Sequence, residues 1–342
     1  MLSSSLLSLG CGVAAPHVPA FDTHQRALDQ RSGSLAILGD TQRTSFIERY
    51  LLGREDNTAE QPTLTADLIA QQPAALVLVG DLVFDGGSNA DWEWFDGLFA
   101  GLPRATPVLP IWGNHEYWWS SSERATEAQL AARFRGLPSR RYYSRRLGRL
   151  GLILLDSNLR WASRHRPQGA RPSALQRRFE ARWQAQLRFF AEQLDHFEAD
   201  PSVDHVLVFT HHPVYSLGPW GHPEPRLHGD LIPAFLSHPK ARAWFSGHAH
   251  GYERFGLRDG ERGARGDKAF VVTAGGGGPR PEQLELRASP LPPAYRGPRP
   301  LNYVLASQRD GGLELVVRGL VDGVHASELE RLTLRSSASP GN

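Results

Sequence analysis

The chain has 342 residues, of which 40% are hydrophobic and 22% are charged, so it can bury a full core and is not intrinsically disordered. Its 38 Lys and Arg residues nearly balance its 36 Asp and Glu residues, and the scattered basic residues form no stripe for binding nucleic acid. The single cysteine, Cys11, excludes an internal disulfide.

Residues 1–33 predict a targeting segment followed by a linker. A short Leu/Ser stretch leads to Gly10-Cys11, and a spacer containing Pro and Ala continues through Ala20. This resembles the end of a bacterial lipoprotein signal with Cys11 as the lipidated residue, although no Lys or Arg precedes the stretch. We therefore expect export to the periplasm or outer surface, with membrane contact only through a lipid anchor at Cys11. The alternative is a frayed N-terminus with a chance cysteine.

Residues 34–342 predict a single domain in which short apolar runs alternate with amphipathic segments. Seven runs are aliphatic or β-branched and end at Gly, Asp, Asn or His, as buried strands do: Leu35–Leu38, Ala75–Val79, Val108–Trp112, Gly151–Leu155, His205–Phe209, Ala243–Phe245 and Ala269–Thr273. Helices are predicted at Phe46–Leu52, Leu64–Gln72, Trp92–Leu102 and Ser173–Phe197. The β-rich segments Asn302–Ser307, Leu313–Leu320 and Leu329–Leu334 have no helices between them and predict an antiparallel flank. The fold class is therefore α/β with mixed sheets.

Candidate site residues of metal-binding types follow five of the seven runs. These residues are Asp40, Gln42, Asp81, Asn114, His115, His211, His212, His248 and His250. If the runs are neighbouring strands, their carboxyl ends share one edge of a sheet, where open α/β folds bind ligands. Oxygen and nitrogen donors without cysteine fit Mn, Zn or Fe better than a thiolate site does.

Two neighbouring cations need a ligand that bridges them, and an ionised carboxylate has the two oxygens and the charge to do so. Asp81 is the candidate bridge. We expect one ion to bind Asp40, His250 and, as a further ligand, Gln42, and the other ion to bind Asn114, His211 and His248. Such a pair makes a water acidic enough to attack at neutral pH, and a phosphate ester is the substrate most suited to it.

Five blocks of this sequence resemble the signature of calcineurin-like metallophosphoesterases, in the family's order: Gly39-Asp40-x-Gln42, Gly80-Asp81, Gly113-Asn114-His115-Glu116, His211-x-Pro213 and Gly247-His248-x-His250. The segments 247–254 and 273–278 are similar to the purple acid phosphatase branch. The resemblance implies a sandwich of two mixed β-sheets flanked by helices, with the metal site at the C-terminal strand edge. It implies the same ligand roles for two divalent or mixed-valence ions, and it places His115 beside the leaving group, outside the metal shell. The implied partner is a small-molecule phosphate ester, hydrolysed as by a phosphomonoesterase.

Two positions depart from the family pattern. The tyrosine that binds ferric iron in purple acid phosphatases is Phe84 here, and the histidine that many members carry two residues after the first Asp is Gln42. We therefore expect a colourless protein that does not depend on Fe(III) and whose first metal exchanges more easily than its second.

Several alternatives stay open at this level. Asp40 and Asp81 could cap the helices that follow them. His211 and His212 are adjacent and cannot point the same way from an extended backbone, so His211 is taken as the ligand and His212 as a substrate contact. His222 and Tyr252 are further candidate substrate contacts. The activity could also be that of a phosphodiesterase or nucleotidase, or the scaffold could serve a non-catalytic binding protein.

Overall fold

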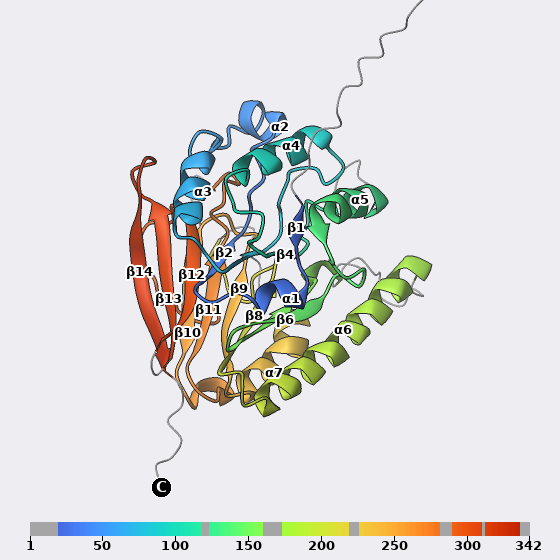
Figure 1. Cartoon of the computed structure of the whole chain (residues 1–342), viewed down its shortest axis with the longest axis vertical. Helices are drawn as coiled ribbons and strands as arrows, with labels where there is room; N and C mark the ends of the chain where they lie inside the picture. The colour runs from blue at the N-terminus through green and yellow to red at the C-terminus, as the bar shows by residue number, and fades with distance from the viewer. Residues whose placement is uncertain are drawn as a thin grey trace, which may run out of the picture.

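The computed structural model describes residues 20–117, 123–159, 173–218, 226–280, 289–309 and 312–335. Two six-stranded mixed sheets pack face to face, and helices cover their outer faces (Figure 1). The predicted fold class, a sandwich of two mixed sheets flanked by helices, is confirmed. Cys11 and His222 lie outside the described residues.

The first sheet has the strand order β14-β13-β12-β2-β3-β4. Its parallel half is built from short buried strands, β2 (Leu35–Leu38), β3 (Ala75–Leu78) and β4 (Val108–Pro110). Its antiparallel half is the predicted flank, in which β12 pairs with β2: β12 (Leu301–Arg309), β13 (Gly312–Leu320) and β14 (Ala326–Arg335). The three parallel strands therefore all end at the same edge of the sheet.

The second sheet has the order β10-β11-β9-β8-β7-β6. Its four central strands are parallel: β11 (Lys268–Thr273), β9 (Ala241–Ser246), β8 (His205–Thr210) and β7 (Leu150–Leu154). The edge strands β10 (Tyr252–Leu257) and β6 (Tyr143–Leu147) run antiparallel to their neighbours. The strands β6 and β10 were not predicted, because neither alternates clearly between polar and apolar residues.

The two sheets share one buried core between them, to which Ile37 and Val77 contribute from one sheet and Leu207 and Phe245 from the other. The outer face of the first sheet is covered by α3 (Gln61–Ala70) and α4 (Asn89–Leu98). The outer face of the second sheet is covered by α6 (Ala174–Ala199) and α7 (Ile232–Ser237). A π-helical turn, Leu227–Leu231, directly precedes α7. Further helical elements are α2 (Phe46–Tyr50), α5 (Glu123–Arg133) and the 3₁₀ turn Glu261–Gly263. In the part of the chain described, no helix is both long and apolar enough to cross a bilayer.

Part of the predicted linker belongs to the folded body. Residues 20–33 contain β1 (Phe21–Asp22) and α1 (Gln25–Leu28), and β1 pairs in parallel with β5 (Phe134–Arg135). The side chains of Phe21 and Leu28 are buried. A two-residue strand carries no periodic pattern that a sequence can reveal. The boundary at residue 33 stays a prediction.

Candidate metal centre

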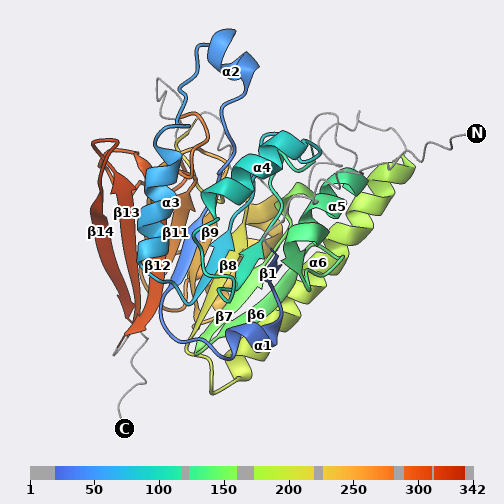
Figure 2. The same ribbon diagram turned by 45° about the horizontal axis from the view of Figure 1, so that its top comes forward.

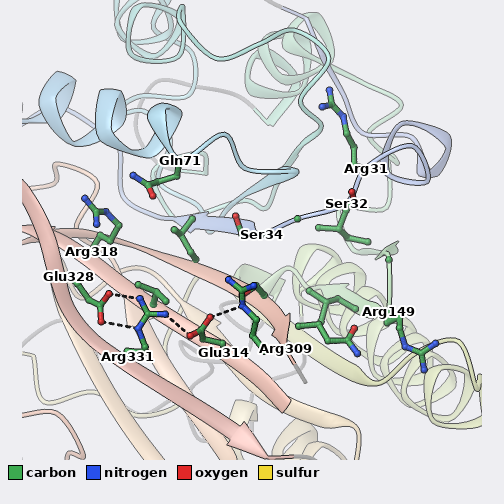
Figure 3. Close-up of a pocket in the computed structure, with 18 residues that line it drawn as sticks. Arg31, Ser32, Ser34, Gln71, Arg149, Arg309, Glu314, Arg318, Glu328 and Arg331 are labelled. Atoms are coloured by element: carbon green, nitrogen blue, oxygen red, sulfur yellow. Dashed lines mark hydrogen bonds and ion pairs between the residues drawn. The ribbon is translucent and has the colours of Figure 1, made fainter. Parts of the chain in front are cut away.

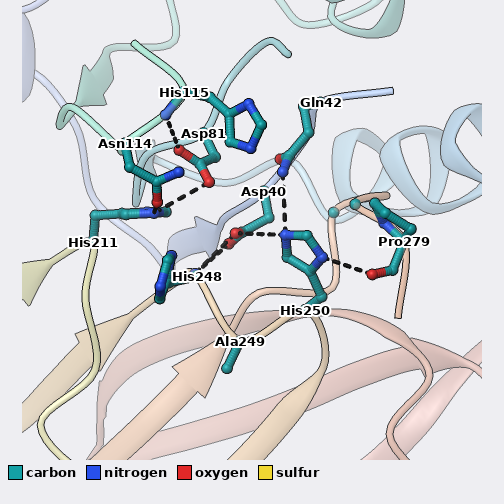
Figure 4. Close-up of polar contacts among 12 residues, drawn as sticks. Asp40, Gln42, Asp81, Asn114, His115, His211, His248, Ala249, His250 and Pro279 are labelled. Atoms are coloured by element: carbon teal, nitrogen blue, oxygen red, sulfur yellow. Dashed lines mark hydrogen bonds and ion pairs between the residues drawn. The ribbon is translucent and has the colours of Figure 1, made fainter. Parts of the chain in front are cut away.

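The predicted ligands converge where the strands of both sheets end (Figure 4). Asp40 follows β2, Asp81 follows β3, and Asn114 follows β4. His211 directly follows β8, and His248 and His250 follow β9. Each strand is completely buried, so its end is held rigidly while the residues beyond it turn toward the common edge.

Four of these ligands have left-handed backbones. The φ angle is 60° at Asp40, 51° at Asp81, 73° at His248 and 41° at His250. A residue with a side chain pays on the order of 1 kcal/mol or more for this conformation, and such residues cluster at functional sites. The strain turns each side chain sharply off its strand end, which favours a binding role over simple helix capping.

Close packing of the backbone requires glycine at two positions of the five sequence blocks, Gly80 and Gly113. Gly80 has φ 89°, and a Cβ atom there would lie 2.6 Å from Nδ1 of His211. A Cβ atom at Gly113 would collide with the carboxylate of Asp81. Any larger residue at either position would push a candidate ligand out of place.

The first group of donors consists of Asp40, Asp81 and His250, whose ligand atoms all lie within 4.8 Å of one another. Nδ1 of His250 donates to the carbonyl oxygen of Pro279 at 2.7 Å, which leaves the Nε2 lone pair facing Oδ1 of Asp40 at 3.5 Å. The amide nitrogen of Gln42 lies 3.1 Å from the same Nε2, and its Oε1 atom is buried without a hydrogen-bond partner among the described residues. A buried acceptor without a hydrogen-bond partner fits a position at which a cation would bind.

The second group lies around His211. Its Nδ1 donates to the carbonyl oxygen of Val79 at 2.9 Å, while its Nε2 faces Oδ1 of Asn114 at 3.0 Å and Oδ2 of Asp81 at 3.2 Å. Both partners of Nε2 are acceptors, so the contact requires either a proton or a cation among these three atoms. Asp81 faces both groups, and its bridging role stays a prediction.

The electrostatics of the protein groups at this site also favour bound positive charge. Burial raises the pKa of Asp40 well above its ordinary value, because His211 offsets only part of the desolvation. Burial also opposes ionisation of Asp81, but the charges of His211 and His115 hold its pKa below the ordinary range. Burial lowers the pKa of His211, yet the charge of Asp81 outweighs it and raises that pKa to about 9. Burial lowers the pKa of His250 to about 4, so its Nε2 is available as a neutral donor.

These observations fit two cations. Acceptor atoms face one another in both groups, the donors are oxygen and imidazole nitrogen, and each of two ligand histidines is oriented by a hydrogen bond from its other ring nitrogen to a backbone carbonyl. The donor set suits Mn, Zn or Fe, and Phe84 supplies no phenolate.

His115 lies at the rim of the site. Its backbone N–H donates to Oδ1 of Asp81 at 2.9 Å, and its Nδ1 lies 2.7 Å from the carbonyl oxygen of Phe84. With Nδ1–H donating to that carbonyl, Nε2 is the ring atom available to exchange a proton with a bound substrate. His115 belongs to neither donor group, and its role beside the leaving group stays a prediction.

The assumption of an extended backbone at His211 and His212 was wrong. Strand β8 ends at Thr210, so the chain bends there, and the two rings lie 5.0 Å apart. His211, His212 and His248 bring ring nitrogens within 4.8 Å of one another. Nδ1 of His212 lies 2.8 Å from the hydroxyl of Ser157, which also accepts the backbone N–H of His212 at 3.0 Å. The structure thus brings His212 to the second group, where a substrate or a metal can meet it.

Tyr252 does not join the site. Its ring is buried in the core between the sheets, and its hydroxyl donates to Glu330 of β14 at 2.7 Å. Arg254 contacts the same carboxylate. The predicted substrate contact by Tyr252 is therefore wrong: the side chain ties β10 to β14, because an inward-facing residue at the start of a strand points between the sheets.

Sequence reasoning missed the role of Glu116. Its carboxylate accepts the backbone N–H groups of Asp81 at 3.0 Å, Leu82 at 2.8 Å and Gly113 at 2.6 Å. It thereby joins the turns after β3 and β4 and aims Asp81 at the site. Burial, together with the charge of Asp81, raises the pKa of Glu116 to about 7. Its place directly after Asn114-His115 was the only sequence signal.

The glycine-rich run 275–278 is a tight turn beside the first group. The backbone N–H of Gly278 donates to the carbonyl oxygen of Asp40 at 2.9 Å, and that of Gly276 donates to Gly39 at 2.8 Å. A Cβ atom at Gly278 would lie 2.9 Å from Nε2 of His250. The turn therefore supports the ligand loops.

A cavity of about 550 Å³ lies away from these strand ends, where β2 begins and β12 ends (Figure 3). Arg331 contacts both Glu328 and Glu314, and Arg309 contacts Glu314, whereas Arg149 and Arg318 pair with Asp204 and Asp67 outside the lining. Because none of the strand-end ligands lines it, this cavity is not the chemical site.

Comparisons with known proteins agree with this geometry. The sequence model of calcineurin-like phosphoesterases matches residues 33–252, well over half of the chain. The fold is similar to a purple acid phosphatase from yellow lupin (Lupinus luteus), with TM-score 0.64 and 16% identity over 90% of this chain and 54% of that one. It is also similar to GAP50, the anchor in the inner membrane complex of Plasmodium (TM-score 0.60, 13% identity, 90% of each chain), and to a dimetal phosphatase from Danio rerio (TM-score 0.58, 15% identity, 90% and 100%). The chain spans about half the length of the lupin enzyme. No curated protein matches it. At these identities the likeness to solved structures concerns the fold alone.

Proposed function

The chain belongs to the calcineurin-like phosphoesterase family, and from that premise we propose that it is a two-metal hydrolase of phosphate esters that acts on monoesters. The observation that carries the proposal is the convergence of donors from five separate strand ends on two adjacent points, with Asp81 facing both. Residues that only capped separate helices would not be expected to converge in this way.

The assignment of ligands follows the two groups. Asp40, His250 and Gln42 would hold one cation, Asn114, His211 and His248 the other, and Asp81 would serve both. His212 lies beside the second group, where it could join those ligands or meet the phosphate. Bound cations supply Lewis acidity toward the phosphate oxygens and toward an attacking water.

The protein's own contribution to leaving-group departure is His115. Its ring is oriented by the bond from Nδ1 to the carbonyl of Phe84, so in the imidazolium form Nε2–H is the group that would give its proton to the departing alkoxide. Oδ1 of Asp81 accepts the backbone N–H of His115 at 2.9 Å, which fixes the position of the acid relative to the donor groups. A rigidly held acid of this kind contributes roughly 10²- to 10⁴-fold to the rate.

The test is elemental analysis of the purified protein together with hydrolysis of p-nitrophenyl phosphate and its bis-ester, each with and without added Mn, Zn or Fe. Two metals per chain and faster turnover of the monoester support the proposal. Preference for the bis-ester would favour a phosphodiesterase, and two bound metals without turnover of either ester would favour a binding protein. A visible charge-transfer band would contradict the expected colourless site.

We also propose that the protein is exported and anchored through Cys11. The support is the Leu/Ser stretch before Gly10-Cys11 and the spacer after it. Radiolabelled palmitate should label the wild-type chain in a bacterial host but not the Cys11→Ser variant. Equal labelling of both chains, or of neither, would contradict the anchor.

A further inference from the structure

Helix α2 carries Glu48 inward and its apolar residues outward. Glu48 is 7% exposed, whereas Phe46 is 71%, Tyr50 61% and Leu51 73% exposed. Ile47 and Leu52 are exposed as well. Surface helices of globular proteins have the opposite orientation, so this helix presents an apolar face that the fold itself does not cover.

Polar contacts hold α2 in this orientation. Ser45 and Glu48 form a reciprocal cap, in which the backbone N–H of Ser45 donates to Glu48 at 3.0 Å and that of Glu48 donates to the Ser45 hydroxyl at 3.2 Å. Arg54 adds an ion pair to the same carboxylate at 2.5 Å. Because Glu48 anchors the helix from beneath, the apolar side chains point away from the body, where Figure 2 shows α2 standing clear of both sheets.

A cavity of about 460 Å³ lies at the base of this helix. Its aromatic lining is Phe46, Tyr50 and Phe84, and the rest of the lining is Arg43, Thr44, Ser45, Arg49, Asp56, Thr58 and Asp91. The charges cancel in pairs: Arg43 contacts Asp91 at 2.9 Å, and Arg49 contacts Asp56. The rings of Phe46 and Tyr50 contact each other in a tilted arrangement, with their centroids 4.7 Å apart. A cavity with paired charges and aromatic walls is suited to an uncharged apolar group.

This cavity adjoins the candidate acid. The ring of Phe84, which lines the cavity, lies 5.0 Å from the ring of His115, and the carbonyl of Phe84 is the partner of His115 Nδ1. Arg43, on another wall, directly follows the candidate ligand Gln42. The cavity is therefore on the side of the site where a proton is delivered to the leaving oxygen, and the group attached to that oxygen extends toward α2.

We propose that the cavity at the base of α2, together with the exposed face of that helix, binds the apolar part of the alcohol released from the phosphate ester. The preferred substrates are then phosphate esters of large apolar alcohols. This inference rests on the proposed function, because it assigns a specificity surface to the same site. Phe46 and Tyr50 are its principal contacts, and Phe84 joins them to His115.

The test compares ethyl phosphate with octyl phosphate, the latter below the concentration at which it aggregates. The two alkoxide leaving groups have nearly the same intrinsic reactivity, so a difference in kcat/KM reports binding of the alkyl chain. A fully buried methylene contributes about fourfold. Because the cavity is partly open, we expect octyl phosphate to be favoured by roughly tenfold or more. The variants Phe46→Ser and Tyr50→Ser should each reduce that ratio several-fold, and the double variant should bring it close to one.

Val324→Ser is the matched control, because Val324 is 61% exposed in the turn between β13 and β14 and belongs to neither site. This variant should keep the wild-type ratio. Phe46 and Tyr50 are largely exposed, so their replacement by Ser should leave the fold intact, which circular dichroism verifies.

Calorimetry with octylphosphonate and ethylphosphonate, which cannot be hydrolysed, separates this inference from the proposed activity. One outcome is that neither ester is hydrolysed, octylphosphonate binds at least tenfold more tightly than ethylphosphonate, and Phe46→Ser removes that difference. The proposed hydrolase activity is then wrong, whereas the proposed binding surface is supported. Equal binding and equal kcat/KM for the two chain lengths overturn the inference even if both esters are hydrolysed. Loss of binding to phosphatidylglycerol vesicles in Phe46→Ser, with an unchanged octyl-to-ethyl ratio, would also overturn it and make α2 a membrane-docking face.

Discussion

The backbone N–H of His115 donates to Oδ1 of Asp81 at 2.9 Å, which joins the candidate acid directly to the candidate bridging carboxylate. The bond uses the main chain of His115, so its side chain can be replaced without removing the bond. The chemical role of the ring can therefore be tested separately from the metal site.

We predict that His115→Asn retains two metals per chain and loses roughly 10²- to 10⁴-fold in kcat for ethyl phosphate. The loss should be much smaller for p-nitrophenyl phosphate, whose leaving group needs little protonation. Steady-state kinetics and elemental analysis provide the measurements. If both esters slow by the same factor, His115 does not act as the acid.

Asp81→Asn should abolish binding of both metals, since the neutral amide replaces the one anionic group that faces both donor groups. Asn tolerates the left-handed backbone, φ 51° at this residue, better than Ala does, so the fold should survive. Elemental analysis and circular dichroism test this, with Asp195→Asn as a control because that carboxylate is 77% exposed. Retention of one metal at full occupancy would show that Asp81 does not serve both.

Gln42→His should slow the loss of the first metal. The Oε1 atom of Gln42 is buried without a partner in the described structure, whereas an imidazole in its place supplies a stronger donor beside His250. Metal content after timed dialysis against a chelator is the measurement. The first metal should be retained longer in the variant than in the wild type, and the second should be unaffected. Equal release from both proteins would mean that residue 42 is not a ligand.

The stability of the protein should fall between about pH 6.5 and pH 4 in part because of His205. Burial, with the nearby charge of Arg242, lowers the pKa of His205 to about 4. Below its ordinary pKa of 6.5 the unfolded chain binds a proton that the folded chain does not, so stability decreases as pH falls through this window. His205→Gln should show a weaker decrease in urea unfolding measured across it. His325→Gln, whose side chain is 82% exposed, should retain the wild-type slope.

Most of the fold followed from local patterns. The strands β2, β3, β8 and β11 begin and end within one residue of their predicted bounds, because fully buried parallel strands are continuous apolar runs that stop at turn residues. The strand β6 was missed because its centre, Ser144 to Arg146, is polar and half-buried. The helix α5 was missed because few apolar residues mark an inner face.

The identity of the candidate ligands was determined by the sequence itself: Asp40, Asp81, Asn114, His211, His248 and His250 follow apolar runs whose strand character is local, and their order carries the family resemblance. Only the tertiary structure decided how three other side chains lie. It brought His212 to the second donor group, turned Tyr252 into the core, and made Glu116 the clamp between two turns. The physical reason is that a strand and its ending depend on neighbouring residues, whereas the direction of a side chain beyond that ending depends on bends and long-range hydrogen bonds between segments far apart in the chain.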